Sequence, residues 1–454
     1  MRISPKQLLQ GLLYLTPIAL LALASCGGGG GGSTTPPLTT ATVPAAPTGV
    51  SATDATKCTV RIQVSWNAVT GAAGYNIYRD TASSVTATTP LNSATPISMN
   101  SYIDTDPTLS AGTNYYYKVT ARNSVGESLR SVAASAVAPA PTACTNVGGS
   151  IQGSALPILA QVTTFAGHYP NQGYLDGAAS TAQFLSPTAI ATDGVYLYVA
   201  DKDNDVIRKI AISSGAVSTV AGIATSPGSV DSINGTPQFN RPDGITIDPT
   251  GTTLYVSDTG NGSIRKIDLS TTPVTVTTLA PSIGIGSVPR GITIDQSGAY
   301  VYVADVHNHA VIQVDTTTGS LYTVTTALTA PIGITTIGTN LYVTDSMIGG
   351  NTGTISQITI GTWTMASGAS GFNIPQGITS DGANLYVTNS GDHTVYKVDP
   401  GTWASTKMTG TIGTAGYVNG AVGSALFNSP TGITTDGSYL YVVDSGNNVI
   451  RKIQ

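Results

Sequence analysis

Alternating hydrophobic and polar positions recur in six copies of one pattern, from about Thr181 to the last residue. Each copy begins with a proline, soon followed by a small residue and an isoleucine, and reaches a Tyr-Val strand that ends on Asp or Asn. The prolines are Pro187, Pro242, Pro289, Pro331, Pro375 and Pro430, and the strand ends are Asp201, Asp258, Asp305, Asp345, Asn389 and Asp444. A period of roughly 40–50 residues made of short strands is typical of a β-propeller, which is an all-β fold.

The first copy, residues 187–222, divides into four short segments that are rich in β-branched and aromatic residues. The predicted strands are 188–192, 196–201, 206–212 and 217–221. Asp193 and Gly194 predict a tight turn between the first two strands, because both residue types tolerate positive φ. A single four-stranded blade cannot bury its own faces, so we expect the six blades to stack around one axis.

A small residue occupies the same place in the first strand of every copy. These residues are Ala189, Gly244, Gly291, Gly333, Gly377 and Gly432. Six strands that crowd around one axis bring their backbones close together, and a Cβ atom would stand in the way. We therefore interpret these positions as structural.

The sixth copy contains three predicted strands before Gln454, while the segment 161–167 is a predicted strand outside any copy. Its sequence, QVTTFAG, resembles AVSTVAG at 216–222, the fourth strand of the first copy. We expect 161–167 to pair beside Val449–Ile453 and to complete blade six. Such closure removes the exposed strand edges that would otherwise promote aggregation.

Three stretches resemble the NHL repeat family: FNRPDGITIDPTGTTLYVSDTGNGSIRKID (239–268), FLSPTAIATDGVYLYVADKDNDVIRKI (184–210) and FNSPTGITTDGSYLYVVDSGNNVIRKI (427–453). The loops 173–184 and 416–427 resemble the spacers of this family. The resemblance implies a six-bladed propeller over residues 161–454. Members of the family bind proteins or RNA and a few are lyases, so the resemblance alone assigns no function.

The N-terminal residues resemble a targeting segment. A positively charged start precedes an apolar stretch at Leu8–Ala24, and Leu-Ala-Ser-Cys at 23–26 resembles a bacterial lipobox. We expect residues 1–26 to be a lipoprotein signal peptide and Cys26 to carry lipid, which would anchor the chain to a membrane without a transmembrane helix. An ordinary secretory signal with a chance cysteine is the alternative.

Residues 27–45 form a Gly/Ser/Thr/Pro-rich linker that begins with six glycines, as suits a flexible stalk. Gly27 is not the aspartate that resembles an inner-membrane retention signal. The predicted location is therefore the bacterial cell envelope, at the outer membrane or cell surface.

Residues 46–139 resemble a fibronectin type III domain, a β-sandwich whose strands alternate with polar turns. The resemblance is carried by PTGVSAT, VRIQVSW, GYNIYRD, SYIDTD and LSAGTNYYYKVTARNSVGES, which occur in the family's order and spacing. We expect Trp66 to fill the core between the sheets. Tyr115 matches the family's corner tyrosine, whose hydroxyl returns to the backbone. Residues 140–160 are assigned to a linker.

The cysteine content fits an exported protein. With Cys26 lipidated, Cys58 and Cys144 are left as an even pair, and outside the cytoplasm such a pair tends to be oxidised. We therefore predict a disulfide between Cys58 and Cys144.

Charged residues are sparse, at 9% of the chain against about a quarter in typical soluble proteins. The net charge of −5 argues against nucleic acid as a partner, since nucleic acid favours a basic face. Surfaces rich in Thr, Ser, Asn and Gly suit polar recognition of sugars or peptides.

Candidate chemistry is limited, and no cofactor is required by any motif. The chain has four histidines, which are His168, His307, His309 and His393. His309 and His393 share the turn position of Asp205, Gly262 and Asn448 in other copies, which favours a turn role. Some propellers that resemble this one are lyases that hold zinc with histidines of several blades, so His307, His309 and His393 are also a candidate metal site.

The sequence DKDND, with Asp201, Asp203 and Asp205, has the alternating carboxylates of a calcium loop. It lacks the glycine and the distal glutamate of an EF-hand, and the aligned turns keep only one or two of the acids. We expect Asp201 to cap its turn through hydrogen bonds from its side chain to the backbone. Calcium at this turn is the alternative.

The residue directly after each proline varies, whereas its surroundings repeat. These residues are Thr188, Asp243, Arg290, Ile332, Gln376 and Thr431. A structural requirement would repeat the same residue, so we expect the polar members, Thr188, Asp243, Arg290, Gln376 and Thr431, to line the axial face and bind a ligand. A solvated rim without a ligand is the alternative.

The sequence therefore predicts an exported, lipid-anchored chain with a stalk, a fibronectin-like spacer and a six-bladed propeller. The propeller would recognise a protein or polysaccharide partner at its axial face, which favours a binding protein over an enzyme. Two alternatives stay open: a metal-dependent lyase that uses the histidines, and a structural role in surface assemblies.

Overall fold

The computed structural model describes residues 42–54, 62–92, 97, 101–104, 106, 108–138, 145–147, 149–152, 156, 159–232, 235–346 and 352–454. Every described strand belongs to the compact unit Val43–Gln454. Cys26, Cys58 and Cys144 lie outside the described residues, as does the predicted signal peptide 1–26. Within the described ranges, no helix is long and apolar enough to cross a membrane.

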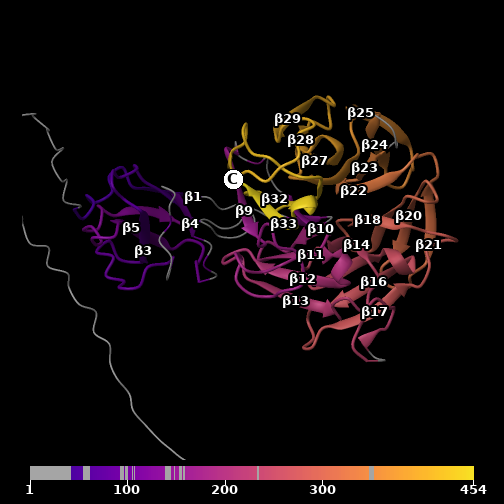
Figure 1. The fold of residues 1–454 in the computed structure, drawn as a ribbon, viewed down its shortest axis with the longest axis horizontal. Coiled ribbons are helices and arrows are strands. Elements are labelled where there is room, and N and C mark those ends of the chain that lie inside the picture. The colour runs from indigo at the N-terminus through magenta and orange to yellow at the C-terminus, as the bar shows by residue number, and fades with distance from the viewer. Residues whose placement is uncertain are drawn as a thin grey trace, which may run out of the picture. The chain divides into compact units, whose positions relative to one another are not determined.

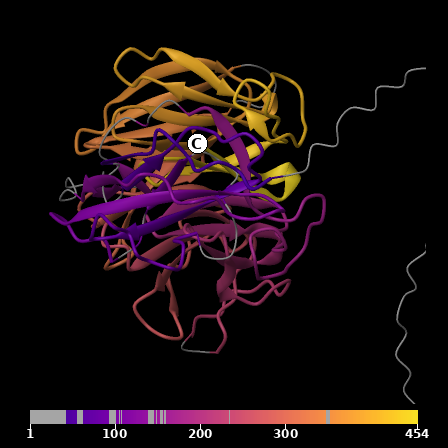
Figure 2. The same ribbon diagram turned by 90° about the vertical axis from the view of Figure 1, so that its left-hand side faces the viewer.

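The N-terminal module contains two three-stranded sheets (indigo to violet in Figures 1 and 2). One sheet has the order β1 (Ser51–Asp54), β2 (Ile62–Ser65), β4 (Ser101–Asp104), and the other has the order β3 (Gly74–Asp80), β5 (Asn114–Arg122), β6 (Ala134–Val137). Both sheets contribute to one hydrophobic core, which includes Ile62, Val64, Ile77 and Val119. The segment therefore folds around its own core.

Two aromatic residues of this module lie where the sequence predicts. Trp66 is buried in the shared core, with its ring centroid 5.2 Å from that of Tyr75. The hydroxyl of Tyr115 donates to the carbonyl of Thr108 at 3.3 Å and accepts the N–H of Ser110 at 2.9 Å. The expected return of this hydroxyl to the backbone is confirmed.

Residues 159–454 form six antiparallel sheets (Figure 1). In the first five sheets the strands follow one another in chain order from the axis outward. Blade 1 contains β10 (Pro187–Thr192), β11 (Tyr196–Asp201), β12 (Val206–Ala211) and β13 (Val217–Gly222). Blade 2 contains β14 (Pro242–Ile247), β15 (Thr253–Asp258), β16 (Ser263–Asp268) and β17 (Thr275–Ala280). Blade 3 contains β18 (Pro289–Ile294), β19 (Tyr300–Asp305), β20 (Ala310–Asp315) and β21 (Leu321–Thr325). Blade 4 contains β22 (Pro331–Ile337), β23 (Asn340–Asp345), β24 (Gly353–Thr359) and β25 (Met365–Phe372). Blade 5 contains β26 (Pro375–Ser380), β27 (Leu385–Asn389), β28 (Thr394–Val398) and β29 (Ser405–Thr409).

Blade 6 joins strands from both ends of this region. Its order is β30 (Gly420–Ala421), β9 (Gln161–Ala166), β33 (Val449–Ile453), β32 (Leu440–Asp444), β31 (Pro430–Thr435). β9 pairs antiparallel with β33, so that Ala166 lies opposite Ile450 and Val162 opposite Ile453. The predicted pairing of 161–167 with Val449–Ile453 is confirmed. The first strand of each blade contacts the first strand of the next, and β31 contacts β10, which closes a ring of six sheets.

The strands of blade 1 match their predicted bounds to within one residue. In the turn after β10, Gly194 has a φ of +88°, whereas Asp193 does not adopt positive φ. The carboxylate of Asp193 instead accepts the N–H groups of Val195 and Tyr196, at 2.7 and 2.6 Å. The turn was predicted correctly, but Asp193 contributes hydrogen bonds rather than a left-handed backbone.

At the five glycines of the small-residue position, the first strands approach one another too closely for a side chain, whereas blade 1 accommodates Ala189. A Cβ atom on Gly244 would lie 2.0 Å from the carbonyl oxygen of Arg290, and one on Gly333 would lie 2.0 Å from that of Gln376. Real Cβ atoms do not make contacts this short, so the structural interpretation of these positions is confirmed. The hydroxyl of Thr344 reaches the same Gln376 carbonyl at 2.7 Å and links the two blades.

A short hairpin from the predicted linker 140–160 packs inside the ring. It consists of β7 (Thr145–Val147) and β8 (Ser150–Gln152). The carbonyl of Gly149 accepts the N–H of Thr192 at 2.9 Å and the hydroxyl of Thr434 at 2.8 Å, and the Gln152 amide donates to the carbonyl of Thr336 at 2.7 Å. These partners stand at the ends of the first strands of blades 1, 6 and 4. The segment predicted as a linker therefore plugs one end of the channel, a role that its sequence did not reveal.

Candidate functional site

The end of the ring opposite the plug carries the variable residues that follow each proline. These are Thr188 on β10, Asp243 on β14, Arg290 on β18, Ile332 on β22, Gln376 on β26 and Thr431 on β31. Each is the second residue of a first strand, while the plug contacts the last residues of those strands. The predicted ligand residues therefore share one end of the axis.

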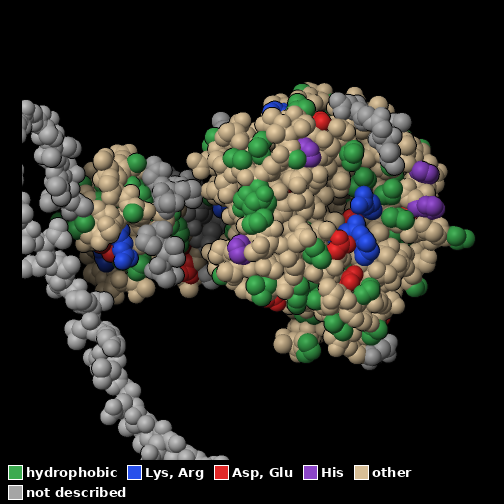
Figure 3. Space-filling view, viewed as in Figure 1, with side chains coloured by type: hydrophobic (Ala, Val, Ile, Leu, Met, Phe, Trp, Pro, Cys, Tyr) green, Lys and Arg blue, Asp and Glu red, His purple; other side chains and the backbone are tan. Residues whose placement is uncertain are grey.

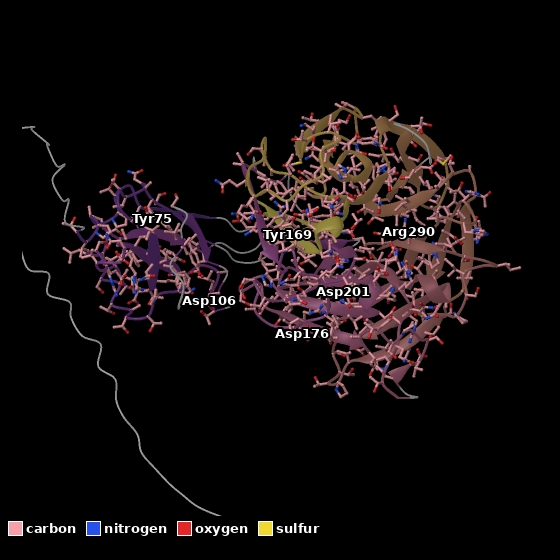
Figure 4. All side chains as sticks on the ribbon, viewed as in Figure 1. Tyr75, Asp106, Tyr169, Asp176, Asp201 and Arg290 are labelled. Carbon is pink, nitrogen blue, oxygen red and sulfur yellow. The ribbon has the colours of Figure 1, made fainter. Side chains whose placement is uncertain are left out.

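Charged side chains meet at this end over blades 1 to 3. The carboxylate of Asp243 lies 2.5 Å from the Nζ of Lys202 and 3.4 Å from a guanidinium nitrogen of Arg290. Beside Asp243, Arg241 forms an ion pair with Asp203 at 3.1 Å. Figure 3 shows blue and red side chains gathered on the face turned to the viewer, and Figure 4 labels Arg290 in that region. We call Lys202, Asp203, Arg241, Asp243 and Arg290 the axial cluster.

Three members of the axial cluster were not predicted from the sequence. Lys202 and Asp203 belong to the 3₁₀ turn η1 (Lys202–Asn204) that follows β11, and Arg241 directly precedes Pro242. The DKDND motif was considered as a calcium loop, so its lysine was not connected with Asp243. That connection spans 41 residues and crosses between blades, and only the folded ring shows it.

The remaining predicted ligand residues differ in how they are held. The hydroxyl of Thr188 donates to the carbonyl of Asp243 at 2.9 Å, which links blades 1 and 2. Thr431 is 9% exposed, and its hydroxyl has no hydrogen-bond partner among the described residues. Gln376 is partly exposed and lies on the strand next to Thr431. Thr188, Asp243 and Arg290 lie on the first strands of three consecutive blades, 1 to 3. Gln376 and Thr431 lie on those of blades 5 and 6.

The histidines occupy turns that tie neighbouring blades together. His309 and His393 have φ values of +57° and +59°, as do the other residues of this turn position, within a few degrees. The Nδ1 of His393 accepts the N–H of Ser429 at 3.0 Å, and the Nδ1 of His309 contacts the carbonyl of Thr329. The interpretation of this position as a turn position is confirmed.

No three His, Cys, Asp or Glu side chains within the described ranges form a group that could hold a metal ion. His307, His309 and His393 are therefore not brought together as a ligand set there. His168 lies in the loop after β9, where its Nδ1 is 3.5 Å from the side-chain amide of Asn171. The candidate zinc site thus has no geometric support from these four residues.

The carboxylates of DKDND also serve separate protein partners. Asp201 accepts the N–H of Leu185 at 2.8 Å and lies 2.7 Å from the guanidinium of Arg208. Asp203 pairs with Arg241 of the axial cluster, and the carboxylate of Asp205 accepts the N–H of that residue at 2.8 Å. The predicted capping by Asp201 is wrong, because its side chain makes no capping hydrogen bond to η1 and accepts instead the N–H of Leu185 and the side-chain amide of Asn204. Its buried partner Arg208 was not foreseen. Burial raises the pKa of Asp201 to about 6, since the loss of hydration outweighs its hydrogen bonds and Arg208.

A ring of threonines around the plug was also missed. The fifth residue of each first strand is Ala191, Thr246, Thr293, Thr335, Thr379 and Thr434. The hydroxyls of Thr379 and Thr434 contact that of Ser150 in the plug. Those of Thr246, Thr293 and Thr335 are buried without a partner among the described residues. The signal was present in the sequence, because the dipeptide Ile-Thr recurs at this position in five of the six copies.

Comparison with known proteins places this region among propellers. A family model described as lactonase, seven-bladed β-propeller matches residues 191–336. NHL repeat-containing protein 2 of Bos taurus is 33% identical over 106 residues, and the Gallus gallus protein of the same name is 35% identical over 101 residues. Part of this chain is similar to NHL-repeat proteins. The matches cover 23% and 22% of this chain, and only 15% and 14% of those two proteins.

Solved structures share the fold over most of the chain. A structural genomics protein of unknown function from Bacteroides thetaiotaomicron has a TM-score of 0.53 at 17% identity, covering 90% of this chain and 99% of that one. An auxiliary nutrient binding protein from the same organism has a TM-score of 0.52 at 14% identity, covering 89% of this chain and 97% of that one. At such identities the likeness shows the all-β, propeller-like fold alone. The family model is described as seven-bladed, whereas six sheets close the ring here.

Proposed function

We propose that this chain is a lipid-anchored binding protein of the bacterial cell envelope. In this proposal a fibronectin type III spacer carries a six-bladed NHL-type propeller, whose axial face recognises a protein or polysaccharide partner. The residues proposed for recognition are Thr188, Asp243, Arg290, Gln376 and Thr431, together with Lys202 and Arg241.

The axial cluster is the observation that carries this proposal. It gathers three cations and two carboxylates in a chain with few charges and a net charge of −5. Its side chains are held by ion pairs and still reach solvent, since that of Arg290 is 25% exposed and that of Arg241 59%. Exposed cations and carboxylates gathered at one place favour a partner whose charged or polar groups are complementary to them.

Two further features support a binding role. The plug packs at the other end of the first strands, so the axial cluster lies at the end of the axis that the plug leaves uncovered. The solved structures with this fold include auxiliary nutrient binding proteins from Bacteroides thetaiotaomicron and Bacteroides ovatus. These names describe the neighbours, and they support a binding role here only by analogy of fold.

Affinity capture from the native cell envelope tests the proposal. The full chain in detergent is used as bait, next to variants with Arg290→Ala or Asp243→Ala. Lys266→Ala on β16 is the control, because it removes a partly exposed cation away from the axial cluster. We expect both axial variants to lose most of the captured partner and the control to retain it. Equal capture by all four chains would discard the axial site.

The anchor and the disulfide are separate proposals that concern residues outside the described ones. Metabolic labelling with a fatty acid should mark the wild-type chain and not Cys26→Ala, and equal labelling would end the anchoring proposal.

Mass analysis without reductant should show Cys58 and Cys144 joined, and free thiols at both would remove the bridge. Bound zinc in the purified chain would instead favour the competing proposal of a metal-dependent lyase that uses His307, His309 and His393.

A further inference from the structure

Two stacked tyrosines stand where the two ends of the ring meet. Tyr169 lies in the loop after β9, and Tyr417 lies in the segment before β31. Their ring centroids are 3.9 Å apart and their planes differ by 16°. Tyr169 is 44% exposed. Figure 4 labels Tyr169, and at that part of the face Figure 3 shows hydrophobic side chains gathered among polar ones.

The stack is supported from beneath by a buried arginine. The guanidinium of Arg451 lies 5.1 Å from the ring centre of Tyr417, and because Tyr169 covers one face of that ring, Arg451 must lie against the other. Arg451 is itself fixed by Asp444 at 2.8 Å. The hydroxyl of Tyr417 lies 2.6 Å from that of Thr164 on β9. The position of Tyr169 is therefore set by a layered support, which leaves its outer side toward solvent.

The chain neighbours of Tyr169 are polar, and the one charged residue of its loop, Asp176, is paired with Arg208 at 2.6 Å. His168, Asn171 and Gln172 are all exposed neighbours in the chain. The side-chain oxygen of Gln172 accepts the amide of Asn448 at 3.1 Å, which connects the loop to blade 6. An exposed aromatic ring among amides combines an apolar face with hydrogen-bonding groups.

We propose that Tyr169 is the platform for a pyranose ring of a polysaccharide. The C–H bonds on one face of a pyranose are weakly positive and pack against the negative face of an aromatic ring, while amides pair with the hydroxyls at its edge. A ring that is already held in place loses little conformational entropy on binding. This platform deepens the proposed binding function by naming the partner class, and it rests on that function but not on the axial cluster.

A protein partner fits these observations less well. Specific protein interfaces bury roughly 800 Å² on each partner around an apolar centre depleted of polar groups. Here His168, Asn171 and Gln172 stand beside the exposed ring in the chain, while the exposed Tyr174 and Leu175 follow further along the loop. The immediate neighbours of the ring suit a hydroxyl-rich ligand better. Figure 3 shows the hydrophobic group and the axial cluster on the same face of the ring, so an extended glycan could contact both.

Calorimetric titration of the full chain in detergent tests the platform. The probes are cellohexaose, chitohexaose, maltohexaose and xylohexaose. We expect at least one of them to bind, with an affinity that falls about tenfold or more in Tyr169→Ala and is kept in Tyr169→Trp. Tyr322→Ala is the matched control, because Tyr322 is 51% exposed but lies on the outer strand of blade 3. This control should bind like the wild type.

Two further outcomes decide against the platform, and a third decides only against the axial proposal. If no hexasaccharide binds, or if Tyr169→Ala binds as tightly as the wild type, the proposal is overturned. If Tyr169→Ala loses an envelope protein in affinity capture while no hexasaccharide binds, the stack is a protein contact, and the binding function stands without the glycan. If a hexasaccharide binds through Tyr169 but Arg290→Ala changes no capture, the platform stands and only the axial proposal falls.

Discussion

The ring has two halves that are built alike near the axis and differ at the periphery. Blades 6, 1 and 2 each carry a fully buried arginine on the third strand, namely Arg451, Arg208 and Arg265. At the same position blades 3, 4 and 5 carry Ile312, Ser356 and Tyr396, as their pairing with Val303, Val343 and Val387 shows. The first strands, their close approach and the ring closure are alike in both halves.

The arginines hold the long spacers that precede their own blades. Arg208 donates to the carbonyls of Leu175 and Gln183 and pairs with Asp176, and its guanidinium lies 5.0 Å from the ring centre of Phe184. Arg265 and Arg451 repeat this arrangement with 230–239 and 418–427. Between blades 3, 4 and 5 the connections are short, and no such loop needs an anchor.

The spacers change how deeply the side chains of the outermost strand are buried. Val162, Val217 and Val276 hold equivalent positions on the fourth strands of blades 6, 1 and 2, and all three are buried. The counterpart in blade 3 is Leu321, which is 45% exposed. An anchored spacer therefore adds a cover over the blade edge, and the blade folds without it in the other half.

The burial of the three Asp–Arg pairs in blades 6, 1 and 2 indicates their structural role. Burial raises the pKa of Asp201, Asp258 and Asp444 in spite of the arginine beside each. Desolvation thus outweighs the attraction, as is common for buried ion pairs. Because blades 3 to 5 fold without the arginine, the pair serves to position the spacer rather than to stabilise the blade.

The largest expected effect concerns the seam in blade 6. Deleting Gln161–Ala166 removes the strand that pairs with β33 and exposes its edge, together with the core around Val162. We expect the chain to lose cooperative thermal unfolding or to melt far below the wild type. Gln161→Ala, which alters an exposed side chain and keeps the strand, should melt like the wild type. A deletion variant that melts like its parent would show that the ring does not depend on this closure.

The next largest effect is a difference in stability loss between the two halves when the residue at the arginine position is replaced. Arg208→Met leaves Asp201 buried without its cation and frees the spacer carbonyls, so we expect a loss of roughly 3–5 kcal/mol in the free energy of unfolding. Ile312→Met at the matching place in blade 3 exchanges one apolar side chain for another and should cost less than about 1.5 kcal/mol. Denaturant unfolding measures both. Equal losses would mean that the arginine has no special role.

A smaller effect compares the outer strands. Val276→Ala should cost about 2 kcal/mol, because this side chain is fully buried under the spacer. Leu321→Ala in blade 3 should change stability by no more than about 0.5 kcal/mol, since its side chain reaches solvent. The same unfolding experiment checks the pair. If Leu321→Ala is as costly as Val276→Ala, the blade edges are equally covered and the comparison fails.

The smallest effect is a pH dependence of opposite sign in the two halves. The pKa of Asp201 in the folded chain is about 6, above the ordinary value near 3.9. The contribution of Asp201 to the free energy of unfolding is therefore present at low pH and is lost as pH rises from about 4 through 6. In blade 3 the N–H groups of Thr318 and Thr317 lower the pKa of Asp315, so its contribution is lost as pH falls below about 4.

Unfolding free energies between pH 3 and 7 test these signs. The difference between wild type and Asp201→Asn should fall as pH rises from 4 to 6. The difference between wild type and Asp315→Asn should fall as pH drops below 4. A flat or rising profile for Asp201→Asn would show that Arg208 controls this carboxyl more strongly than burial does.

Much of the fold was predictable because it repeats locally. Alternation and turn residues placed the strands of blade 1 to within one residue, and the likeness of 161–167 to 216–222 revealed the closing strand. The small residue of each first strand, glycine in five blades and Ala189 in blade 1, marked the crowded axis. Variability after the prolines pointed to Asp243 and Arg290, which the structure joins.

What the sequence by itself determined is therefore the repeated part: blades, closure, crowded axis and the turn role of His309 and His393. Only the tertiary structure decided the plug, the arginine-held spacers, the axial cluster and the tyrosine stack. Each of these joins residues that occur once or in some blades only, such as Gly149 with Thr434 or Tyr169 with Tyr417. Local propensity reports on neighbours in the chain, whereas such contacts depend on where the closed ring places distant segments.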